Sequence, residues 1–151
     1  MTRLLLLIAM FIFSTTYSQK VAYDSVLAKE TGADDYGMKK YVMAFLKEGK
    51  NRLDDSAARQ QLQIDHLKNI MRLADEGKLI VAGPFLDNQS IRGIFIFNVQ
   101  TIEEAQALTA TDPAIKAGVL EMELHPWYGS AALVEVLRIH PTLQKKSILN
   151  E

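Results

Sequence analysis

The sequence predicts an α+β domain in which two helices cover one face of a four-stranded antiparallel sheet. Four short segments are rich in apolar and β-branched residues, and two longer segments between them begin with residues that favour helix starts. These segments follow one another in the order β-α-β-β-α-β, which is the ferredoxin-like split βαβ pattern. A chain of 151 residues, 48% of them hydrophobic, is sufficient for one domain with its own core.

The first half of this pattern is a strand followed by a long helix. Residues 40–47 carry a run of apolar side chains, which predicts a strand that is covered on both faces. Residues 48–52 are charged and contain a glycine, so we expect a turn there. Residues 54–56 (Asp-Asp-Ser) favour a helix start, and the helix is predicted to run to Glu76, where Gly77 stops it.

The second half repeats the pattern with shorter elements. Thr101 and Glu104 have the spacing of a capping box, which marks the start of the second helix. Asp112 precedes Pro113, and a proline disfavours helical geometry in the residue before it, so the helix must end by this point. The expected elements are strands at 79–82, 91–99 and 119–125 and a helix from Thr101 to about Ala110.

The second face of the predicted sheet should also be buried. Its strands are apolar on both sides, whereas two helices can cover only one face. We therefore expect a homodimer whose sheets pack face to face, forming a dimeric α-β barrel. Residues 131–139 could add a strand or helix at the sheet edge.

The N-terminus has the layout of a signal peptide. Leu4–Phe13 is an unbroken apolar run that follows Arg3, and Thr16 and Ser18 place small side chains before a cut at Gln19. Ten apolar residues are too few to span a bilayer, which needs about 20, so we expect a periplasmic or secreted protein with no membrane contact after cleavage. The N-terminal organisation predicted is a signal peptide at 1–18 and an exposed leader at 19–38.

The composition excludes several classes of function. The chain has no cysteine, which rules out a disulfide scaffold, a thiol nucleophile and a cysteine zinc site. Its 17 Lys and Arg residues are balanced by 18 Asp and Glu residues, without the basic stripe that nucleic-acid binding needs. A small molecule of neutral or mixed charge, or another protein, is the expected partner.

His66 is the most informative candidate for chemistry. At about 100° per residue it falls inside the apolar arc of the long helix, between Leu73 and Ile70. An imidazole on that face needs a hydrogen-bond partner. It is either a core histidine with a satisfied ring or a general acid–base, and the second role needs a carboxylate to fix the tautomer.

Asp112 is the candidate for that carboxylate, because it lies at a break in regular structure. It could instead serve only local backbone bonds at a helix end. Gly83, Pro84 and Phe85 end the second strand and are candidates for a substrate-binding wall, although a plain turn explains them equally well. No pair among His66, His125 and His140 has a short metal-ligand spacing, so we expect no metal and no other cofactor.

Several of these motifs occur together in a known family. The chain contains DHLKNIMRLADEGKLIVAGPF, GIFIFNV and TIEEAQALTATDPAIKAGVLEMELHPW in this order. The combination resembles the YCII-related family, which is grouped with the DGPF domain proteins, and it covers roughly residues 39–128. Residue Ala82 stands where the DGPF branch has Asp, so the chain is more similar to the YCII branch. Residues 129–151 form a C-terminal extension.

The resemblance implies a ferredoxin-like domain that dimerises through its sheets and carries a His–Asp pair in a pocket. By motif position these residues are His66 and Asp112. One branch of the family acts as a dehydrochlorinase, which implies metal-independent acid–base chemistry of the lyase, dehydrochlorinase or isomerase type on a small organic molecule. The alternative function is a non-catalytic domain that binds a small molecule or a protein on the same fold.

Overall fold

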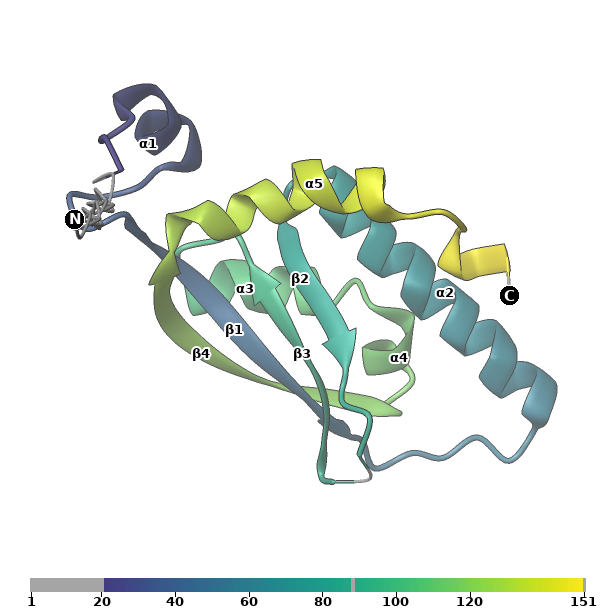
Figure 1. The fold of residues 1–151 in the computed structure, drawn as a ribbon. Helices are drawn as coiled ribbons and strands as arrows, with labels where there is room; N and C mark the ends of the chain where they lie inside the picture. The colour runs from purple at the N-terminus through teal and green to yellow at the C-terminus, as the bar shows by residue number, and fades with distance from the viewer. Residues whose placement is uncertain (1–20, 88, 151) are drawn as a thin grey trace, which may run out of the picture.

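The fold is that of a computed structural model, which describes residues 21–87 and 89–150 (Figure 1). The predicted signal peptide and its cleavage site lie outside these residues. The helices and strands are α1 (Ser25–Thr31), β1 (Met38–Glu48), α2 (Ser56–Asp75), β2 (Leu79–Pro84), β3 (Ile91–Phe97), α3 (Ile102–Thr109), α4 (Pro113–Lys116), β4 (Leu120–Ser130), the 3-10 helix η1 (Ala131–Glu135), α5 (Val136–Leu143) and the 3-10 helix η2 (Ile148–Asn150).

The strands form one antiparallel sheet in the order β2-β3-β1-β4. This order places β1 and β3 at the centre and β2 and β4 at the edges, as the ferredoxin-like pattern requires. The predicted fold class is therefore confirmed. Within the described part of the chain, none of the helices combines the length and apolar character needed to cross a membrane.

Successive side chains of β1 point to opposite faces of the sheet. The side chains of Val42, Ala44 and Leu46 are buried on the face that carries α2 and α3. Their partners on β3 include Phe95 and Phe97, and the register pairs Ala44 with Phe95. This main cluster also contains Leu73 of α2, Leu79 of β2 and Ala105 of α3.

Local signals decide where the helices start and end. Asp55 caps α2 by accepting from the Ala58 N–H at 2.7 Å. Both bonds of the capping box predicted for α3 are present between Thr101 and Glu104. Gly77 follows α2 with φ of 67°, a conformation that glycine adopts without strain.

Two elements differ from the sequence prediction. The fourth strand was expected to end at residue 125, but β4 continues to Ser130. Pro126 is tolerated there because β4 is an edge strand, where a missing N–H need not cost a ladder bond. The segment expected to be an exposed leader contains α1, which Asp24 caps at its start and Gly32 ends at φ of 72°.

The second face of the sheet is partly covered by the chain itself, whereas the sequence predicted that one copy leaves it bare. Tyr41, Ile80 and Ile96 are buried there. Residues of η1 and α5 pack on them together with Trp127, because the C-terminal segment folds back over this end of the sheet (Figure 1). The half-buried side chains that remain further along the face are Met43, Phe45 and Ile94.

Candidate active site

His66 and Asp112 lie in direct contact, although 46 residues separate them in sequence. Nδ1 of His66 is 2.7 Å from Oδ2 of Asp112 and 3.0 Å from Oδ1. Asp112 is 1% exposed and His66 is 7% exposed. The contact therefore joins two buried polar groups from different elements, α2 and the turn before α4.

Local sequence explains the position of Asp112. The residue is the N-cap of α4, and Pro113 occupies the first helical position, where its missing N–H costs nothing. The Ala114 N–H donates to Oδ1 of Asp112 at 2.8 Å. Asp112 thus serves the helix end and holds the imidazole at the same time, so the two interpretations of this residue are not exclusive.

The carboxylate determines which ring nitrogen is available. An ionised carboxylate only accepts hydrogen bonds, so Nδ1 of His66 must donate, and in the neutral ring Nε2 then carries the lone pair. Phe95 stacks on the imidazole with 6.1 Å between ring centroids and 16° between planes, which fixes the ring orientation. Among the described residues none forms a hydrogen bond with Nε2 of His66.

His66 lines a cavity of about 820 Å³ between α2, β2 and the C-terminal segment. Most of its wall is apolar, with Leu67 and Ile70 of α2 among the lining residues. Asp112 does not line it. Asp112 therefore contacts Nδ1 from outside the cavity, while the His66 side chain itself contributes to the cavity wall.

Two of the three residues predicted to form a substrate-binding wall line the cavity, and the third does not. Gly83 and Pro84 line the cavity with His66, whereas Phe85 does not and is 46% exposed. Gly93 also lines it, and a Cβ at this position would lie 2.5 Å from the Gly83 carbonyl oxygen. Only glycine therefore allows this close approach of β3 to β2, a requirement that sequence reasoning missed.

Hydrogen bonds of the Arg72 side chain also connect α2 to the turn that carries Asp112. The Arg72 guanidinium donates to Asn69 Oδ1 at 2.8 Å and to Thr111 Oγ1 at 3.0 Å. Asn69 is buried on the same helix face as His66, one turn further along. Its spacing of three residues from His66 could have identified it as a polar residue near the site. Its Nδ2 is the one buried side-chain polar atom without a partner among residues 21–87 and 89–150.

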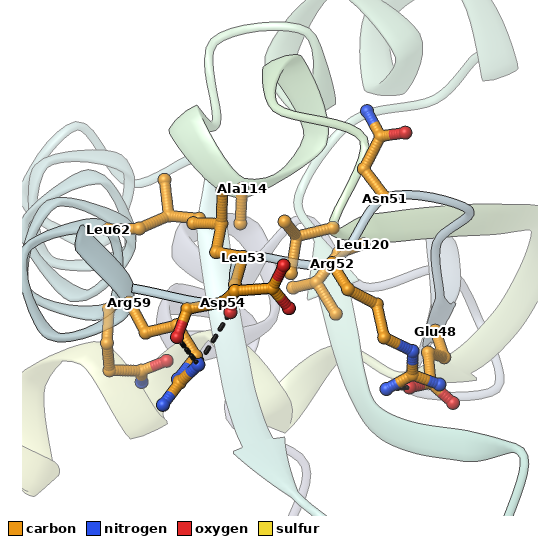
Figure 2. A pocket seen from close by; sticks show the side chains of 11 residues that line it. Glu48, Asn51, Arg52, Leu53, Asp54, Arg59, Leu62, Ala114 and Leu120 are labelled. Carbon is orange, nitrogen blue, oxygen red and sulfur yellow. Dashed lines mark hydrogen bonds and ion pairs between the residues drawn. The ribbon is translucent and has the colours of Figure 1, made fainter. Parts of the chain in front are cut away.

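A smaller pocket of about 420 Å³ adjoins the cavity (Figure 2). It lies between α4 and the segment that joins β1 to α2, which the sequence indicated only as a turn. Arg59 donates to the Leu53 and Asp54 carbonyls at 2.6 and 2.8 Å, and these bonds hold one rim (Figure 2). Gln63 and Leu120 line both hollows, so the smaller pocket borders the cavity that contains His66.

The other two histidines lie in different surroundings. His125 is on the uncovered part of the sheet, where its Nε2 is 2.7 Å from Glu123. His140 of α5 lines the same cavity as His66. In the part of the chain that the structure describes, no three His, Asp or Glu side chains are grouped as a metal site.

Comparisons with known proteins identify a family for this chain. The sequence model of the YCII-related domain matches residues 40–128, more than half of the chain. A search of curated proteins gives no match. Among solved structures, the chain is similar to 5-chloro-2-hydroxyhydroquinone dehydrochlorinase from Burkholderia phenoliruptrix, solved with 2,5-dihydroxybenzoquinone. The two share 21% identity and a TM-score of 0.42 over 57% of this chain and 92% of that chain. Because the family model covers more than half of its length, the chain belongs to the YCII-related domain family.

Proposed function

We propose that the protein is an acid–base enzyme in which His66 takes and returns a proton at a carbon of a small organic molecule. The observation that carries this proposal is the position of the ring: Asp112 holds Nδ1 of His66, and His66 lines a cavity of about 820 Å³. A cavity of this volume is within the range that binds small molecules, about 300–1,000 Å³.

The arrangement suits proton abstraction next to a carbonyl group. Nε2 of His66 would accept the proton, and the electron pair of the broken C–H bond would form a new double bond. The positive imidazolium that results would lie beside the Asp112 carboxylate at 2.7 Å, which stabilises it. Return of the proton to another carbon gives isomerisation, and departure of a leaving group with its electron pair gives elimination, as in a lyase or dehydrochlorinase.

Solvent exchange tests the proposal without knowledge of the substrate. A panel of small ketones, lactones and phenols is incubated with the protein in deuterium oxide, and loss of C–H signals is followed by proton NMR. We expect exchange in at least one compound and its loss in His66→Gln. His125→Gln is the matched control, because His125 is exposed and lies outside the cavity. Equal exchange rates in wild type and His66→Gln would refute a general-base role.

A non-catalytic binding domain is the alternative function, and the low exposure of His66 favours it. A ring that is 7% exposed could orient a bound molecule or satisfy the core without moving a proton. In that case the panel would show binding, detected as NMR shifts of cavity residues, without C–H exchange. A domain that binds only a protein on the same fold would show neither exchange nor shifts at the cavity.

We further propose that the protein is exported and acts in the periplasm or outside the cell. The support is the apolar run from Leu4 to Phe13 and the small residues Thr16 and Ser18 after it. N-terminal sequencing of protein from the expressing bacterium's periplasm should give Gln19 as the first residue. A Met1 start on protein that remains in the cytoplasm would contradict export.

A homodimer through the uncovered part of the sheet is also proposed. Met43, Phe45 and Ile94 form an apolar strip there, bordered by the charged pair Lys47 and Glu123. Light scattering at micromolar concentration should give twice the chain mass. Ile94→Lys should give the monomer mass with unchanged circular dichroism, because a charge cannot be buried in that strip without a partner. A monomer mass for the wild type would rule the dimer out.

A further inference from the structure

The chain beyond the family match forms one wall of the His66 cavity. The match ends at residue 128, yet residues from 136 to 148 line the hollow that contains the imidazole. Figure 1 shows this segment running from the end of β4 across β2 towards α2. We call residues 136–148 the C-terminal strap.

The strap is anchored at its start and lightly held beyond it. Val136 and Leu137 pack on the buried cluster of the outer sheet face. These are the first residues of α5, which has no fully buried residue and no side-chain bond at its N-cap, Glu135. Pro141 lies inside α5 and has no N–H to donate to the carbonyl four residues earlier, which weakens an already short helix. The strap is therefore held by half-buried contacts and not by fully buried side chains.

Two solvent-exposed polar side chains of the strap contribute to the cavity wall. His140 and Gln144 are four residues apart and both line it. Among the described residues, neither side chain has a hydrogen-bond partner, so both are available to a bound molecule. Much of the surrounding wall is apolar, including Leu137 and Ile148 of the strap. A ligand with an apolar body and one oxygen-bearing group would satisfy this wall.

We propose that the strap closes over a molecule bound beside His66, and that His140 and Gln144 bind a hydroxyl, carbonyl or carboxylate oxygen of that molecule. This proposal rests on the proposed function in one respect: both place the ligand in the cavity beside His66. Since the strap lies outside the family match, its contribution to ligand binding would add to that of the matched domain.

A matched pair of probes tests the proposal. Naphthalene and 2-naphthol differ by one hydroxyl, and their binding to the full chain is measured by NMR titration. In the wild type we expect 2-naphthol to bind about fivefold more tightly, the effect of one hydrogen bond. The double variant His140→Ala, Gln144→Ala should lose this preference. Ile139→Ala should keep it, because Ile139 is in the same helix but does not line the cavity.

Hydrogen exchange of backbone amides tests closure. We expect 2-naphthol to slow amide exchange several-fold in the strap as well as in the cavity floor at residues 63–70. Protection of the floor alone, with equal affinities for the two probes, overturns the strap proposal and leaves the cavity as a ligand site. Absence of any shift or protection at the cavity with either probe also overturns it, while the C–H exchange assay decides the proposed function separately.

Discussion

Replacing Asp112 by Asn should reverse the tautomer of His66 while keeping the shape of the site. The carboxamide can still accept the Ala114 N–H through Oδ1, so the cap of α4 survives. Its Nδ2 would stand in the place of Oδ2, which is 2.7 Å from Nδ1 of His66 in the wild type. An N–H group there donates to Nδ1, which moves the ring proton to Nε2 and removes the lone pair from Nε2.

The cost in stability follows from the loss of charge at this contact. A hydrogen bond to a charged group contributes about 1.5–3 kcal/mol, and a neutral one about 0.5–1.5 kcal/mol. Asp112→Asn should therefore lower the free energy of unfolding by about 1–2 kcal/mol, measured by urea denaturation. Asp55→Asn is the matched control, because Asp55 caps α2 without contacting a histidine. It should cost less than about 0.5 kcal/mol, since Asn and Asp are equivalent N-caps.

Nitrogen NMR of the His66 ring gives the second readout. In the wild type the neutral ring should carry its proton on Nδ1, and in Asp112→Asn on Nε2. Any C–H exchange found in the wild type should fall with the tautomer change, whereas Asp55→Asn should retain it. A wild-type ring protonated on Nε2, or a variant with unchanged tautomer and stability, would refute the reasoning that Asp112 sets up His66 as a base.

Three further predictions concern the frame of the site and the N-terminal segment. Leu73→Ala should lower the free energy of unfolding by about 3 kcal/mol in urea, because Leu73 is 1% exposed in the main core. Thr101→Ala should cost about 1 kcal/mol by the same measurement, since it removes the cap that pairs with Glu104. The hydroxyl of Tyr128 donates to Asp34 and, with the Met38 N–H, lowers the pKa of that carboxyl. The associated stabilisation is present above the unfolded-state pKa of about 3.9 and is lost as pH falls through the lower folded value. Tyr128→Phe should raise the Asp34 pKa towards its ordinary range in an NMR titration, and an unchanged pKa would contradict this.

Local signals were sufficient to predict the elements of the family domain. The capping box at Thr101 and Glu104 and the stop at Gly77 depend only on residues a few positions apart, and the structure confirms each of them. Where the predicted and observed ends of a strand differ, pairing with a neighbouring strand determines the observed end. β4 continues to Ser130 because it pairs with β1 along its whole length, as far as Met38.

The candidate pair was found by a different kind of signal. The helical period placed His66 on the apolar face of α2, and the proline after Asp112 marked the end of the second predicted helix. Neither pattern states that the two side chains meet, and the resemblance to the family supplied that expectation. The structure brings them to 2.7 Å because α2 and α4 pack against each other.

The sequence by itself determined the order of strands and helices, the caps and the residues that face the core. Only the tertiary structure decided that residues 136–148 fold back to line the cavity, with His140 in the same hollow as His66. The physical reason is the range of the interactions. Caps and periodicity act within one or two turns, whereas the cavity is bounded by segments that are distant in sequence and meet only when the sheet and its helices have packed.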